Sequence, residues 1–122
     1  MIEILPESEG NILGFRASGK LTDQDYKDVL IPRLKETAAE HGKVRFLYYL
    51  DEDFEGWEPE AMWDDFKVGV GKIKEDFERF ALVGGPKWVE WAMKLDNYLM
   101  KAEVKTFPVD QLQEAWDWIK SS

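Results

Sequence analysis

The hydrophobic positions along the chain fall into short runs of strand length and longer segments with helical spacing. Strands are predicted at residues 2–5, 12–17, 44–50, 80–83 and 104–107. A polar turn at residues 7–11 joins the first two runs, which predicts a hairpin. The run at 44–50 is interrupted only by Arg45, so we expect it at the centre of the sheet, covered on both faces.

Apolar residues three and four positions apart predict a helix after each of the last four strands. The first starts at an N-cap, Thr22, is kinked or broken at Pro32 and stops at Gly42. The second starts at Pro59, the third follows the turn at residues 84–86, and the fourth spans 109–119. The residues expected to face the core are Tyr26, Val29, Leu30, Leu34 and Ala38 in the first helix, Trp88, Trp91, Leu95, Tyr98 and Leu99 in the third, and Leu112, Ala115, Trp116 and Ile119 in the fourth.

The predicted order is β-β-α-β-α-β-α-β-α. An initial hairpin followed by alternating strands and helices predicts an α/β fold with a mixed, mostly parallel five-stranded sheet and four main helices. The length of 122 residues suits one domain, and no repeat or linker interrupts residues 1–122. The chain is therefore expected to form a single domain.

Charge and composition narrow the classes of partner. The net charge of −9 opposes binding to nucleic acid and tight adsorption to anionic lipid, so any membrane contact is expected to be peripheral and apolar. The absence of cysteine excludes disulfides and thiolate metal sites. No secretion signal is recognisable, and no apolar run approaches the roughly 20 residues that span a bilayer. These features predict a soluble, cytoplasmic protein.

Candidate catalytic groups are sparse. Nucleophilic catalysis needs Ser, Thr or Cys beside a base, and none of these occurs between Ala38 and Lys105. The single histidine, His41, precedes Gly42 at a helix end, where a cation is favourable, so we interpret it as structural. Asp64 and Asp65 are adjacent on a helix and do not face each other, which favours a polar helix surface over an acid–base pair. The sequence thus predicts a protein that is not an enzyme and needs no cofactor.

Two segments could hold an ion. Asp51, Asp53, Glu55 and Gly56 match the first half of a calcium loop, but the closing glutamate is replaced by Met62, which favours a solvated acidic loop. The turn at residues 84–87, Gly-Gly-Pro-Lys, could cradle an anion through free N–H groups, but a tight turn before a helix explains it more simply. No metal site is predicted.

Aromatic residues gather around the predicted loop at residues 51–58 and the helix after it. A helix that covers a sheet needs one apolar stripe, and the second and third helices carry more than that. Loops at the C-terminal ends of parallel strands are the usual ligand sites of α/β sheets. Ordinary core packing explains any one of these residues, but together they are the candidates for a ligand site: Phe54, Trp57, Met62, Trp63, Phe66, Val70, Trp88, Val89 and Met93.

Several segments spread over the chain resemble the SpoIIAA-like family of small bacterial proteins. They are Gly19–Thr22, Asp25-Tyr26, Leu30–Leu34, Phe46–Asp51, Phe66-Lys67, Phe80–Gly84, Trp88, Phe107 and Glu114–Trp116. The resemblance implies a fold shared with STAS domains and similar to the CRAL-TRIO lipid carriers. STAS proteins that antagonise anti-sigma factors are phosphorylated on a Ser or Thr just after the central strand. Residues 50–56 contain no hydroxyl group, so this chain departs from that phospho-switch.

These observations lead to two hypotheses for function. The first is a non-catalytic domain with an apolar cleft under the second and third helices, which binds a small lipid-like ligand or associates reversibly with a membrane. Gly69 and Gly71 lower helical propensity in the second helix, which is expected to act as a movable lid. The alternative is a protein-interaction module without ligand, for example a homodimer, that uses the same apolar surface.

Overall fold

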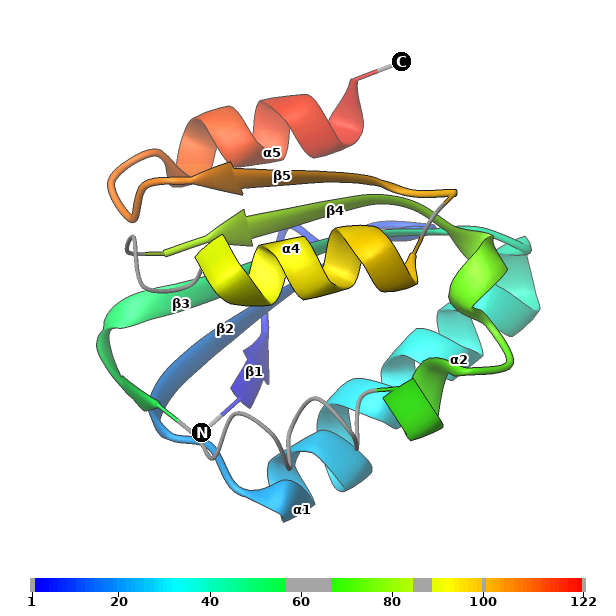
Figure 1. The fold of residues 1–122 in the computed structure, drawn as a ribbon, viewed down its shortest axis with the longest axis horizontal. Helices are drawn as coiled ribbons and strands as arrows, with labels where there is room; N and C mark the ends of the chain where they lie inside the picture. The colour runs from blue at the N-terminus through cyan, green and yellow to red at the C-terminus, as the bar shows by residue number, and fades with distance from the viewer. Residues whose placement is uncertain (1, 57–66, 85–88, 100, 122) are drawn as a thin grey trace.

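Five strands form one mixed sheet in the order β1-β2-β3-β4-β5 (Figure 1). They span Ile2–Ile4 (β1), Ile12–Lys20 (β2), Val44–Gly56 (β3), Phe77–Val83 (β4) and Glu103–Phe107 (β5). β1 pairs with β2 in antiparallel orientation, and the other neighbouring strands are parallel. The computed structural model describes residues 2–56, 67–84, 89–99 and 101–121. The predicted hairpin and the mostly parallel sheet are confirmed.

Helices cover both faces of this sheet. α1 (Asp23–Asp25), the π-helix η1 (Tyr26–Leu30) and α2 (Ile31–His41) follow one another without a break. The other elements are the 3₁₀ turn η2 (Lys74–Asp76), α4 (Val89–Tyr98) and α5 (Leu112–Lys120). Figure 1 shows α5 on one side of the sheet and α2 with α4 on the other. Within the described ranges, no helix is long and apolar enough to cross a membrane.

The first predicted helix forms with the expected start and stop and changes its winding before Pro32. Thr22 and Asp25 cap each other: the Asp25 N–H donates to the Thr22 hydroxyl over 3.2 Å, and the Thr22 N–H donates to the Asp25 carboxylate over 3.0 Å. At Pro32, where a kink or a break is predicted, the π-helical segment η1 ends and α2 begins, because proline supplies no N–H to the turn before it. Gly42 ends α2 with φ of 71°, a left-handed conformation that glycine adopts without strain.

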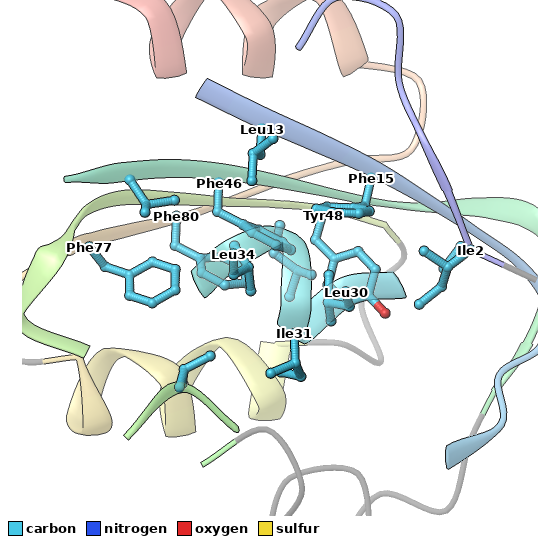
Figure 2. Close-up of a cluster of buried hydrophobic side chains, with 14 of the residues drawn as sticks. Ile2, Leu13, Phe15, Leu30, Ile31, Leu34, Phe46, Tyr48, Phe77 and Phe80 are labelled. Atoms are coloured by element: carbon cyan, nitrogen blue, oxygen red, sulfur yellow. The ribbon is translucent and has the colours of Figure 1, made fainter. Parts of the chain in front are cut away.

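The larger core lies between the sheet and the layer formed by α2 and α4. Phe15, Phe46 and Phe80 come from three adjacent strands and stack across them, with ring centroids 5.5 and 4.6 Å apart. Leu30 and Leu34 cover these rings from the helical side (Figure 2). All five side chains are fully buried. Strand alternation therefore places these three phenylalanines on one face of the sheet, as period-two spacing requires.

A smaller core lies under α5 on the opposite face. Ala115, Trp116 and Ile119 are buried there against Leu47 and Val83. The predicted core face of the last helix is confirmed at these three positions, and Leu112 is half-buried at its edge. The helix begins at Leu112 instead of the predicted Val109.

The main error of the sequence-based prediction concerns the length of β3. The strand was expected to end at Leu50, before an acidic loop, but it continues to Gly56. Its outer half pairs with β2 alone, in a ladder that joins Gly19 to Phe54 and Lys20 to Gly56 after an irregularity in register. Phe54 points into the main core and is 7% exposed. Its burial holds the outer segment of β3 in the sheet, although the acidic residues of that segment disfavour a strand.

Candidate functional site

The described residues of the predicted ligand site fall into two environments. Phe54 and Val70 are buried members of the main core, whereas Met93 on α4 is 63% exposed. The structure therefore packs Phe54 and Val70 into the protein interior and leaves Met93 in solvent. Trp57, Met62, Trp63, Phe66 and Trp88 lie outside the described residues, as does the side chain of Val89, whose backbone begins α4.

A pocket of about 350 Å³ lies beside Tyr98, at the C-terminal end of α4. Its lining among the described residues consists of Tyr98, Lys74, Glu75 and Lys101. Tyr98 is half-buried and packs against the main core, and its hydroxyl donates a hydrogen bond to the Lys67 carbonyl over 3.0 Å. That bond ties α4 to the helical turn at residues 67–70, which lies within the predicted second helix. The pocket therefore lies beside the contact between α4 and this turn.

Two ammonium groups, a carboxylate and an aromatic ring surround this pocket. The Lys74 ammonium lies 5.0 Å from the centre of the Tyr98 ring, within the range of a cation–π contact. The Lys101 ammonium lies 3.7 Å from the Glu75 carboxylate, and both side chains are 70% exposed. Exposed pairs of this kind contribute little to stability, so the pair can separate at small cost. The site thus offers the apolar ring of Tyr98 and two ammonium groups whose present contacts are weak enough to change when a ligand binds.

The pocket lies at the opposite end of the sheet from the predicted one. η2 immediately precedes β4, and Lys101 lies two residues before β5, so both border the N-terminal ends of parallel strands. The sequence predicts the ligand at the C-terminal ends, in loops that lie largely outside the described ranges, and that expectation stays a prediction. Sequence reasoning did not single out Lys74 and Lys101. The sequence feature that could have indicated Lys74 is the stretch 67–74, which carries three lysines and no acidic residue in a chain of net charge −9.

Two further hollows in the described structure are more polar. One, of about 530 Å³, is lined by Thr22, Gln24, Lys27 and Asp28, none of which offers an apolar wall. The other measures about 80 Å³, and its lining includes three glutamates, Glu9, Glu36 and Glu40. Of the three, the pocket beside Tyr98 best matches an apolar ligand, because such sites combine apolar walls with a few polar groups.

Gly69 has a packing role in the predicted lid. A β-carbon at this position would lie 2.7 to 2.9 Å from three side-chain carbons of Ile31 on α2. Ordinary carbon–carbon contacts lie near 3.5–4.0 Å, so only glycine lets the turn at residues 67–70 approach α2 this closely. The glycine that was interpreted as a source of flexibility is thus a point of close contact. Movement of the second helix stays a prediction.

Asp51, the first residue of the calcium-like segment, is held by a network within the sheet. Its side chain is 3% exposed and accepts hydrogen bonds from the Arg16 Nε over 2.7 Å and from the Asp53 N–H over 3.0 Å. The hydrogen bond to Asp51 raises the pKa of the Arg16 guanidinium above its ordinary value, so Arg16 stays charged. Residues 51–56 are a strand and not the predicted acidic loop.

Other candidate ionic groups are dispersed. His41 ends α2 as predicted, and its imidazole lies 3.7 Å from the Glu40 carboxylate at the surface. In the part of the chain that the structure describes, no three His, Asp or Glu side chains are grouped to hold a metal ion. Asp64, Asp65 and most of the turn at residues 84–87 lie outside that part.

Comparison with known proteins identifies a family and a similar solved structure. The family model described as SpoIIAA-like matches residues 12–120 of the chain. The crystal structure of an uncharacterized protein from Shewanella loihica PV-4, of the DUF3478 family and with a SpoIIAA-like fold, is similar with a TM-score of 0.69 and 31% sequence identity. The similarity covers 97% of this chain and 93% of that protein. No curated protein matches the sequence.

Proposed function

The chain belongs to the SpoIIAA-like family, and we propose that it is a binding domain without catalytic activity whose ligand is a small apolar molecule. The ligand is placed between the second and third helices. The pocket of about 350 Å³ beside Tyr98 carries this proposal, because it lies beside the contact between α4 and the turn at residues 67–70. Its volume falls at the lower end of the range of about 300–1,000 Å³ that small-molecule sites occupy.

The absence of catalytic activity is proposed from the chemistry of the sequence. No Ser, Thr or Cys lies between Ala38 and Lys105, a range that includes every residue known to line the pocket. Asp51, a buried carboxylate, is held by Arg16 and by the backbone of Asp53. These residue types suit ligand binding better than catalysis. The predicted ligand residues of the loop after β3, Trp57 and Trp63 among them, follow the opposite end of the sheet from this pocket, so a covering role for them is a separate proposal.

Uptake of a fluorescent fatty acid tests this proposal. We expect Trp57→Ala to leave the melting temperature nearly unchanged and to weaken probe binding, because a side chain that covers a ligand loses more in binding than in folding. Trp118→Ala is the matched control, since Trp118 packs on the opposite face of the sheet with Phe107. Unfolding of the Trp57 variant, or probe binding equal to wild type, would contradict the covering role.

Native mass spectrometry of protein purified from its own host adds a direct measurement. A bound apolar molecule that leaves on mild activation is the expected result. A mass equal to that of the bare chain, together with no uptake of the fluorescent probe by the wild-type protein, would rule out the ligand-binding proposal.

A protein-interaction module is the second candidate function, and two exposed apolar side chains favour it. Val68 is 85% exposed and Met93 63% exposed, an arrangement that suits contact with another protein or a peripheral contact with a membrane. If this candidate is right, analytical ultracentrifugation is expected to show dimers that the pair Val68→Ser and Met93→Ser dissociates. A wild-type protein that stays monomeric up to millimolar concentration would exclude the homodimer.

A further inference from the structure

The charge around the pocket beside Tyr98 opposes that of the whole molecule. The chain carries 25 acidic and 16 basic residues, yet residues 67–74 include Lys67, Lys72 and Lys74 and no acid. Lys101 adds another ammonium group to the lining of the pocket. The described lining of the pocket, two lysines and Glu75, therefore carries a net positive charge on an acidic protein, and such charge attracts anions locally.

The contacts of Lys74 and Lys101 allow both ammonium groups to reach a ligand in the pocket. Lys74 lies over the Tyr98 ring, a contact that keeps its ammonium group beside the apolar wall. Lys101 pairs with Glu75 over 3.7 Å, but both groups are 70% exposed and hydrated. A carboxylate entering the pocket can pair with Lys101 alongside Glu75, because an ammonium group has three N–H donors.

From this arrangement we infer that the occupant of the pocket is an anionic amphiphile, a small molecule with an apolar body and one carboxylate held by Lys74 and Lys101. The inference rests on the proposed function and specifies its ligand class. A neutral apolar molecule gains nothing from the two ammonium groups, and a cation is repelled by them. The volume of about 350 Å³ suits one short chain or ring system, so the ligand is smaller than a membrane phospholipid.

Titration calorimetry of the full chain with decanoate and decanol tests the inference, because the two probes differ mainly in charge. Wild-type protein is expected to bind decanoate about tenfold more tightly than decanol, the factor typical of one charge-assisted hydrogen bond. Lys74→Gln combined with Lys101→Gln is expected to remove that preference and to leave decanol binding unchanged. The control variant, Lys20→Gln combined with Lys35→Gln, removes the same charge from exposed positions on β2 and α2 and is expected to keep the preference.

Three outcomes would overturn the inference, and they differ in what they imply for the proposed function. Equal affinity for decanoate and decanol in wild type and in the lysine variant would refute the anionic class and leave apolar ligand binding intact. Binding of neither probe would refute both proposals. Sedimentation with vesicles of phosphatidylglycerol and phosphatidylcholine, without decanoate binding, would assign the lysines to a membrane surface. The melting temperature of each variant establishes that it is folded.

Discussion

Gly14 and Trp116 show how one small residue makes room for a large one. A β-carbon at Gly14 would lie 2.5 and 2.6 Å from two atoms of the Trp116 six-membered ring. The indole therefore lies directly on the backbone of β2, and Trp116 reaches 2% exposure in a thin core. Its Nε1–H finds no acceptor among the described residues, so this position is held by packing and not by a hydrogen bond.

Gly14→Ala is expected to lower the free energy of unfolding by about 1–3 kcal/mol, because the new methyl group overpacks the site. Trp116→Phe removes the atoms that clash, so the cost of Gly14→Ala should fall in that background. Urea denaturation of the four proteins of this double-mutant cycle measures the coupling. Additive losses would mean that the indole moves aside and that the close approach is not required.

At the scale of one element, arginine side chains from two strands bind the last carbonyl groups of α5. Arg79 donates hydrogen bonds to the Trp118 carbonyl over 2.7 Å and to the Ser121 carbonyl over 2.9 Å, and its guanidinium lies 5.3 Å from the Trp118 ring. Arg45 donates to the Ile119 carbonyl over 3.0 Å. Two arginines from the starts of β3 and β4 thus satisfy the last carbonyls of the helix, at the end where cations are favourable.

Arg79→Ala is expected to destabilise the protein by about 1–2 kcal/mol, because carbonyls at the end of α5 lose a charged donor. Amide hydrogen exchange should rise first at Ser121, whose N–H closes the last turn. Arg33→Ala on the exposed surface of α2 is the control and should change neither quantity. If exchange near Ser121 stayed at the wild-type rate, the capping role would be wrong.

The order of the strands and helices was predictable from the sequence, whereas some features of single elements were not. Short apolar runs and helical spacing suffice for the order of strands and helices, because buried strands and amphipathic helices leave different hydrophobic patterns in the sequence. The outer half of β3 escaped prediction since acidic residues disfavour strands, and only pairing with β2 and the burial of Phe54 offset that tendency. The donors at the end of α5 also escaped, because Arg45 and Arg79 come from strands distant in sequence.

For the molecule as a whole, the two faces of the sheet differ in character. α5 covers one face with a small core closed by Trp116, whereas the layer with α2 and α4 holds the larger core and borders the pocket at Tyr98. The pocket itself was beyond sequence reasoning. Its lysines belong to η2 and to the segment before β5, and only the folded chain brings them beside Tyr98. We therefore expect stability and ligand binding to respond differently to changes on the two faces.

Gly69→Ala and Gly14→Ala form a matched pair for testing this division. In each case the added β-carbon would lie under 3 Å from a buried side chain, Ile31 on one face and Trp116 on the other. Both variants are expected to lose about 1–3 kcal/mol of stability through overpacking. Only Gly69→Ala displaces the turn at residues 67–70, whose Lys67 carbonyl holds Tyr98. Calorimetry should therefore show weaker decanoate binding for Gly69→Ala and wild-type affinity for Gly14→Ala. Equal affinities in the two variants would show that the turn at residues 67–70 does not contribute to ligand binding.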